Sequence, residues 1–285
     1  MNPRSLIAVM VGLVLMAFGG FYFALSPHST ELPLPAPSPP PLVQTATPGA
    51  PPLPDAAAPA PPPPPPPMAT AESIEGEFAQ SEHAELLAVL KRSFNAEYND
   101  LVAMAVRRRN EGASDQAFGQ ELAERFQSIM RGKLKFGVGA GTPTVDKLAA
   151  NEASLFHALG TEGAGLCLKM LGKDDAPATT PPPESVRRLM QLGTLYRFQA
   201  IAEGMAANAK PVEPLSREET RAFEASLARE GLNFRDVNTG AYLKADAEPG
   251  KPCLTLETLH LAIARLPEGT RRKIYAGMFF AGRDK

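Results

Sequence analysis

The feature that most constrains this chain is an uninterrupted apolar stretch near its N-terminus. Residues 6–25 read LIAVMVGLVLMAFGGFYFAL and contain neither a charged residue nor a proline. A helix of this length spans roughly 30 Å, the thickness of the hydrocarbon core of a membrane, and it satisfies its own backbone hydrogen bonds there. The stretch therefore predicts one transmembrane helix, within an N-terminal anchor that covers residues 1–26.

Charge around this stretch predicts the orientation of the chain. Arg4 precedes it, and no further Lys or Arg appears until Lys91. Positively charged flanks stay in the cytoplasm, so we expect a single-pass protein of the bacterial inner membrane with a cytoplasmic N-terminus and a periplasmic domain. A cleaved signal peptide is the alternative, although Ala24-Leu25-Ser26 lacks the usual small-residue pattern. Small residues four apart, such as Ala8 and Gly12, would allow a homodimer through the transmembrane helix.

Residues 27–78 are rich in proline and alanine and include the run Pro61 to Pro67. Proline has no amide hydrogen and a fixed φ, so we expect a disordered linker of largely polyproline II character. At about 3.1 Å per residue, some forty such residues could reach on the order of 100 Å. An anchor followed by a proline-rich stalk resembles the TonB-type energy transducers over about the first seventy residues. The remaining sequence does not resemble their small β-rich C-terminal domain, so their function is not transferred.

Residues 79–285 predict an all-α domain of about six to seven helices. Apolar residues recur at helical spacing, for example from Leu87 through to Ala105, where we expect one long helix. The expected helix starts are Ser114, Thr142 or Thr144, Pro183-Glu184, and the capping box from Ser216 to Glu219. One segment breaks the pattern: residues 234–243 place Asn238-Thr239-Gly240 between two short apolar pieces, which predicts a small hairpin.

The chain has two cysteines, Cys167 and Cys253. In an oxidising compartment, an even number with only one possible pairing predicts a disulfide. Two separate buried thiols remain an alternative. A zinc site that adds His157 and His260 is another, although these spacings match no common zinc pattern.

Glu152 is the one candidate for catalysis. It lies on the helical stripe formed by Val145, Leu148 and Leu155, where an apolar setting would raise its pKa and suit a general acid. Residues 152–156 (EASLF) and 163–166 (GAGL) resemble two motifs of lytic transglycosylases, which implies a peptidoglycan-cleaving glutamate. Ala153 and Cys167 depart from those motifs. The other interpretation is that Glu152 flanks the apolar face, in which case exchange for glutamine would leave stability almost unchanged.

Three further features of the sequence concern the ligands that the chain could bind. Basic clusters on predicted helices are possible contacts for an anionic partner: Arg107, Arg108, Arg109, Arg271, Arg272 and Lys273. The formal net charge is −2, which argues against nucleic acid as a partner. Gly137, Gly139 and Gly141 lack the Lys-Ser/Thr of a phosphate loop and are interpreted as a flexible turn.

Together these patterns predict a non-enzymatic interaction or scaffolding module of the bacterial cell envelope, with no cofactor and no metal. The expected partners are other envelope proteins or peptidoglycan, and the chain meets the inner membrane through residues 6–25. The alternative is a lytic-transglycosylase-like enzyme that uses Glu152.

Overall fold

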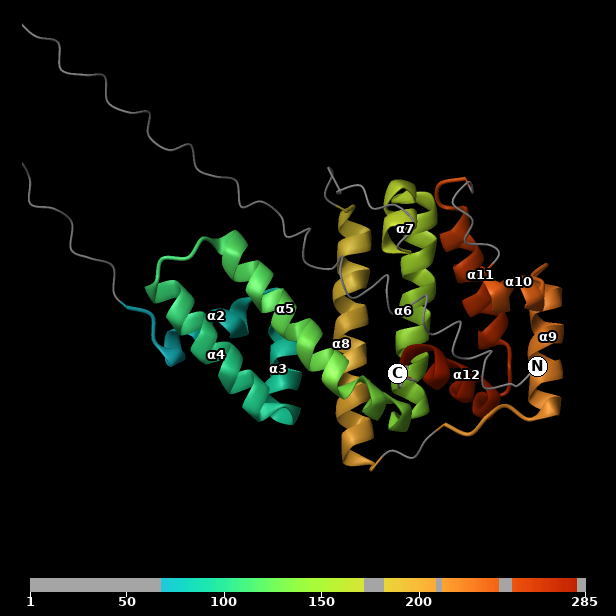
Figure 1. Ribbon diagram of the computed structural model, residues 1–285, viewed down its shortest axis with the longest axis horizontal. Coiled ribbons are helices and arrows are strands. Elements are labelled where there is room, and N and C mark those ends of the chain that lie inside the picture. The colour runs from blue at the N-terminus through green and yellow to red at the C-terminus, as the bar shows by residue number, and fades with distance from the viewer. Residues whose placement is uncertain (1–67, 172–181, 209–211, 241–247, 281–285) are drawn as a thin grey trace, which may run out of the picture.

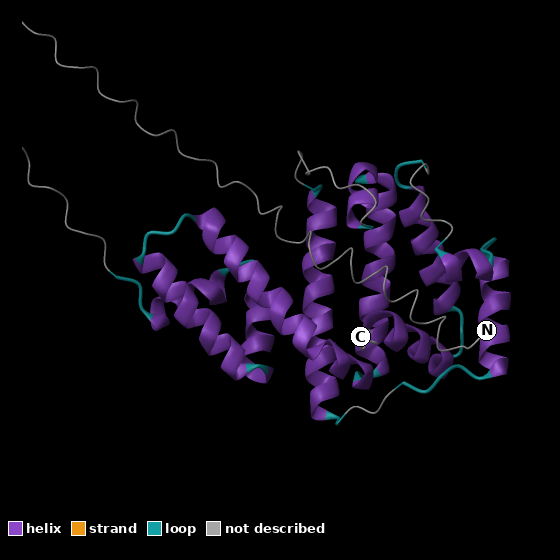
Figure 2. Cartoon of the chain, viewed as in Figure 1, coloured by secondary structure: helices purple, strands orange, loops and turns teal. Residues whose placement is uncertain are grey.

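The computed structural model describes residues 68–171, 182–208, 212–240 and 248–280. Within these ranges the chain forms helices and loops only (Figure 2). The predicted transmembrane segment and most of the predicted linker lie outside them. The elements in chain order are α2 (Ala71–Gln80), α3 (Ala84–Ser93), α4 (Asn95–Asn110), α5 (Asp115–Lys133), the 3-10 helix η1 (Leu134–Gly139), α6 (Thr142–Thr161), α7 (Ala164–Met170), α8 (Glu184–Ala206), α9 (Arg217–Arg229), α10 (Phe234–Thr239), α11 (Lys251–Ala264) and α12 (Glu268–Phe280).

The all-α prediction is confirmed for this part of the chain, with more and shorter helices than expected. Several expected starts are also confirmed. Ser114 caps α5 by accepting a hydrogen bond from the Ala117 amide. Ser216 and Glu219 form the reciprocal capping box of α9. These local signals were readable because a cap needs only residues that are close in sequence.

The single long helix expected from Leu87 to Ala105 is wrong. Phe94 leaves the helical conformation, with φ −137° and ψ 51°, and separates α3 from α4. Its ring is buried and lies edge-on against Phe198 of α8, with 5.6 Å between centroids. The break changes the chain direction while this contact is kept.

The predicted hairpin at residues 234–243 is also wrong. Residues Phe234–Thr239 form helix α10, which Asn233 caps by accepting from the Arg235 amide. Gly240 then adopts the left-handed conformation, φ 67°, that commonly ends a helix. The Asn-Thr-Gly sequence is thus a helix terminus, and residues 241–243 lie outside the described part. Most of helix α2 falls within the range assigned to the linker, so in the described residues helical structure begins at Ala71.

The helices form two lobes on either side of α8 (Figure 1). Helices α2 to α5 make the first lobe, which reaches α8 through α3 and reaches η1 through α5. The second lobe holds α6, α7 and α9 to α12, with α6 packed between α8 and α11. One continuous apolar core runs through both lobes.

The glycine-rich segment serves close packing. A Cβ at Gly137 would lie within 2.2 Å of the Phe280 ring. Gly204 of α8 meets the same segment, where a Cβ would lie 1.7 Å from the carbonyl oxygen of Phe136. Only glycine permits such contacts, so this segment is ordered as η1 and is not a flexible turn.

A disulfide joins Cys167 of α7 to Cys253 in the first turn of α11. The two Cα atoms are 6.0 Å apart, within the usual range, and both side chains are fully buried. The predicted pairing is confirmed. It also removes both sulfurs as zinc ligands, because a metal would need free thiolates.

We predict that Cys253→Ala lowers the free energy of unfolding by about 4 kcal/mol, because the bond closes a loop with a sequence separation of 86 residues. Urea denaturation of the purified protein would measure the change. Fully reduced wild-type protein is the control and should unfold near the midpoint of the variant. Equal midpoints for the variant and the oxidised wild type would contradict the prediction.

Candidate functional site: the buried Glu152–Arg197 pair

The structure places Glu152 inside the core. Its side chain on α6 is fully buried, so the interpretation that it flanks the apolar face is wrong. The Nη2 of Arg197, on α8, donates to its Oε1 at 2.5 Å, and the Arg197 side chain is itself only 6% exposed. The pair therefore joins two helices through charges that are both withdrawn from water.

Electrostatics at this pair are dominated by burial. Burial raises the pKa of the Glu152 carboxyl above its ordinary value, and the positive charge of Arg197 opposes that rise. Among the described residues, Glu152 Oε2 has no hydrogen-bond partner. Gly193 of α8 leaves room for Asn151 beside the pair, since a Cβ there would lie 3.1 Å from Asn151 Nδ2. Asn151 in turn donates to the carbonyl of Leu189 at 2.9 Å.

His260 of α11 is a second buried ionisable group near Arg197. Its ring stacks on Tyr275 at a centroid distance of 5.6 Å and lies close to Phe156 and Phe279. Neither ring nitrogen has a hydrogen-bond partner in the described part of the chain. Burial, with a smaller contribution from the charge of Arg197, lowers the pKa of His260 to about 3. The imidazole is therefore neutral at physiological pH.

This arrangement bears directly on the lytic-transglycosylase motifs. A general acid must reach a substrate oxygen through a hydrogen bond. Glu152 is enclosed, and Arg197 occupies one of its oxygens. The second motif, at residues 163–166, leads into α7, where Cys167 is committed to the disulfide. In this conformation the two segments form packing contacts, and Glu152 has no path to a substrate.

Each basic cluster contacts acceptors of this chain. In the first, Arg107 and Arg108 pair with Glu121, and Arg109 pairs with Glu77. In the second, the residues and their acceptors are Arg271 with Asp146, Arg272 with the Ala140 carbonyl, and Lys273 with Glu219. Much of their charge is therefore compensated locally. Their proposed role toward an anionic partner stays a prediction.

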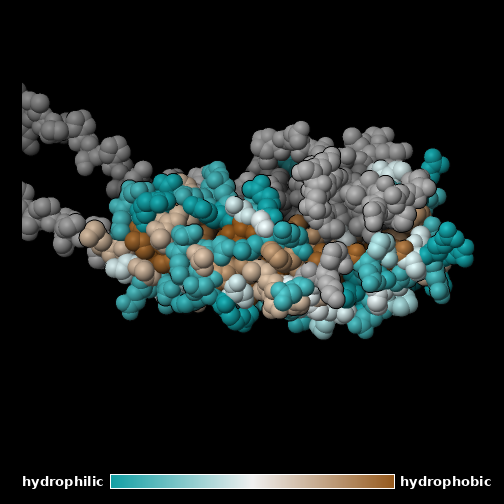
Figure 3. All heavy atoms as spheres, turned by 60° about the horizontal axis from the view of Figure 1, so that its bottom comes forward, coloured by the Kyte–Doolittle hydropathy of each residue, from teal (hydrophilic) through white to brown (hydrophobic). Residues whose placement is uncertain are grey.

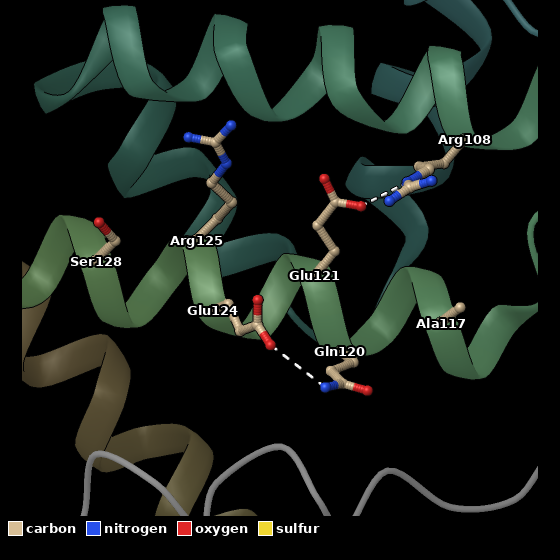
Figure 4. Close-up of a pocket in the computed structure, with 7 residues that line it drawn as sticks. All are labelled: Arg108, Ala117, Gln120, Glu121, Glu124, Arg125 and Ser128. Carbon is tan, nitrogen blue, oxygen red and sulfur yellow. Dashed lines mark hydrogen bonds and ion pairs between the residues drawn. The ribbon is translucent and has the colours of Figure 1, made fainter.

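An open hollow of about 560 Å³ lies along α5 (Figure 4). Its lining consists of Arg108, Ala117, Gln120, Glu121, Glu124, Arg125 and Ser128. All of these except Arg108 come from α5. Arg108 donates to Glu121 at one end of the hollow, Gln120 donates to Glu124 near its middle, and Arg125 lies towards the other end (Figure 4). With one helix supplying most of the wall and charges of both signs, the hollow is polar and has no apolar floor for a small ligand.

The coloured part of the face shown in Figure 3 is mostly hydrophilic, and its most hydrophobic atoms lie in a band along the middle. Two large apolar side chains on α11 are exposed, Leu254 and Leu261. Within the described ranges, no cluster of three or more His, Cys, Asp or Glu could hold a metal ion. No described helix is long and apolar enough to span a bilayer, and residues 6–25 lie outside the described part.

Comparison with protein-family models, with curated proteins and with solved structures finds no match to this chain.

The sequence analysis missed Arg197 and the setting of His260. A signal for Arg197 was present, because it lies seven residues after Met190 and four before Ile201, on the buried stripe of α8. An arginine on such a stripe needs a buried carboxylate, and Glu152 lies on the equivalent stripe of α6. His260 gave no such signal, since its neighbours are aromatic rings from other helices.

We predict that Glu152→Gln lowers the free energy of unfolding by about 3–5 kcal/mol, because it removes the carboxylate that faces the buried guanidinium of Arg197. This replaces the expectation that the exchange is neutral. Glu224→Gln, at an exposed position on α9, is the matched control and should change stability by less than about 0.5 kcal/mol.

A double-mutant cycle separates the coupling between Glu152 and Arg197 from the cost of each single exchange. Glu152→Met with Arg197→Met removes both charges and should be more stable than Glu152→Met alone. Additive effects in urea denaturation would show that the two side chains are not coupled.

We also predict that stability falls as pH decreases from about 6.5 towards 3. The unfolded chain binds a proton at His260 in this range and the folded chain does not, so the slope attributable to His260 is about 1.4 kcal/mol per pH unit. The raised pKa of Glu152 acts in the opposite direction, because it favours the folded state as the pH falls. The test is therefore the difference in stability between wild type and His260→Phe. This difference should follow the slope. His157→Phe, at an exposed position where the ring pairs with Glu257, shows how large a pH-dependent difference an exposed histidine gives. A pH-independent difference would contradict a buried neutral imidazole.

Proposed function

We propose that this chain is a membrane-anchored, periplasmic helical module of the bacterial envelope that binds a partner and does not catalyse a reaction. The main observation in support of a periplasmic location is the disulfide between Cys167 and Cys253, because such bonds persist in oxidising compartments and are rare in the cytosol. The apolar stretch at residues 6–25 and the charge asymmetry around it support the same location.

The position of the stalk supports a role in presentation. Residues 68–70 lie at the end of the first lobe that is farthest from the second lobe (Figure 1). A stalk from the inner membrane would therefore attach at this end and hold the second lobe outward. With a reach on the order of 100 Å, it would bring the second lobe to partners well away from the membrane.

The environment of Glu152 favours binding over catalysis. A glycoside-cleaving glutamate needs an open cleft and a second group that stabilises the developing charge. Glu152 is instead enclosed and paired with Arg197. We propose other envelope proteins or peptidoglycan as partners, since the formal net charge of −2 argues against nucleic acid. Self-association through the transmembrane helix would double the number of presented lobes.

We predict that protease added to spheroplasts digests the helical domain of the full chain, because that domain lies outside the inner membrane. Immunoblotting against the C-terminal residues would follow the digestion, with a cytoplasmic protein as the control for intact cells. A domain that stays protected until the membrane is dissolved would reverse the topology.

A second experiment, on the purified protein, decides between binding and catalysis. The purified full chain should co-sediment with peptidoglycan or cross-link to an envelope protein, and it should release no muropeptides. Release by the wild type would overturn the proposal. Loss of release in Glu152→Gln alone would not identify a catalytic role, because that variant is expected to be unstable.

A further inference from the structure

Helix α2 is the element through which the predicted stalk joins the folded part. It packs on α3 and α4 of the first lobe. Only Ile74 and Phe78 of this helix are buried, and the Phe78 ring lies edge-on to Tyr98 of α4 at 6.4 Å. Its N-terminus is capped locally by Thr70 and Ser73, so the helix does not depend on the lobe for its cap. The attachment of α2 therefore rests on a small apolar contact.

A specific pair of hydrogen bonds holds the chain just before α2. The amide of Ala69 donates to Asn110 Oδ1 at 2.7 Å, and Asn110 Nδ2 donates to the carbonyl of Ala69 at 3.1 Å. Asn110 is the last residue of α4. Its side chain therefore binds the backbone of Ala69, which is where tension applied along the stalk would first act on the folded part.

The remaining contacts of α2 lie at its rim. Glu75 pairs with Lys91 of α3 at 3.1 Å, and Glu77 pairs with Arg109 of α4 at 3.3 Å. All four side chains are well exposed, so water and salt weaken these pairs. They guide α2 to its place and add little resistance to its removal.

The second lobe is held far more firmly. Helix α6 is covered by α8 and α11, with ten of its residues buried, and the disulfide closes the lobe covalently. Local stability in proteins follows such differences in buried contacts, so parts with few contacts open first. The fold therefore predicts that α2 opens before α6 and α8.

We propose that α2 is a releasable strap. Tension on the stalk breaks the Ala69–Asn110 bonds and detaches residues 69–80, and this lengthens the tether while the disulfide-bonded lobe stays folded. The inference rests on the proposed function of a stalk-tethered module. At roughly 3.5 Å per residue the released segment extends to about 40 Å, of which the helix already spans about 15 Å, so release adds about 25 Å of reach.

Hydrogen exchange on the full chain in detergent tests the weak attachment without any assumption about the membrane. Amides of α2 should exchange at least tenfold faster than those of α6 and α8. Asn110→Ala should accelerate α2 about tenfold further and leave α6 unchanged. Asn99→Ala is the matched control, since Asn99 lies exposed on the same helix and bonds only to Asn95 in the described part.

Pulling on the full chain, with a nanodisc and the C-terminus as handles, tests the strap itself. A reversible first step of about 25 Å is expected, at a lower force in Asn110→Ala than in Asn99→Ala. Exchange of α2 together with the core in one global event, or a pull with no early step, would overturn the proposal. Failure to find a partner would weaken the proposed function and leave the exchange result standing.

Discussion

Helix α8 packs against helices on several of its sides at once, and the arrangement of both lobes depends on these contacts. Phe198 faces the first lobe, where the rings of Phe94 and Phe126 lie against it. Arg197, the preceding residue, reaches Glu152 of α6. Gly204 lets η1 approach so closely that a methyl group would not fit. Because each face is committed to a different neighbour, α8 cannot turn about its axis without breaking contacts in both lobes.

The buried ion pair adds specificity at a cost in free energy. Moving two charges out of water is unfavourable, and their attraction only partly offsets it. Leucines of similar volume could hold the same helices together. Their contacts, however, would tolerate a shift of one helical turn, whereas such a shift here would leave Glu152 against apolar side chains. The pair therefore selects one alignment of α6 on α8.

The sequence predicts the parts of this fold that depend on residues close in sequence, or for which only one pairing is possible. Ser114 and Ser216 cap helices through residues three positions away, and two cysteines allow one pairing. The break at Phe94 was missed because the apolar spacing of Leu90, Phe94 and Tyr98 continues unchanged across it. The hairpin was wrong because Asn-Thr-Gly ends a helix as readily as it turns a strand. The pairing of Glu152 with Arg197 depends on which helices meet, which no local pattern encodes.

The disulfide also has a consequence for the order in which the polypeptide is made. Cys253 follows Cys167 by 86 residues, so covalent closure waits until α8, α9 and α10 have been synthesised. Helix α11, which carries Cys253, is also the partner that covers one side of α6. A nascent chain that ends before α11 therefore displays an apolar face and a free thiol together. Truncations in this interval are thus the products most exposed to aggregation and to incorrect intermolecular disulfides, and a chaperone would need to shield them.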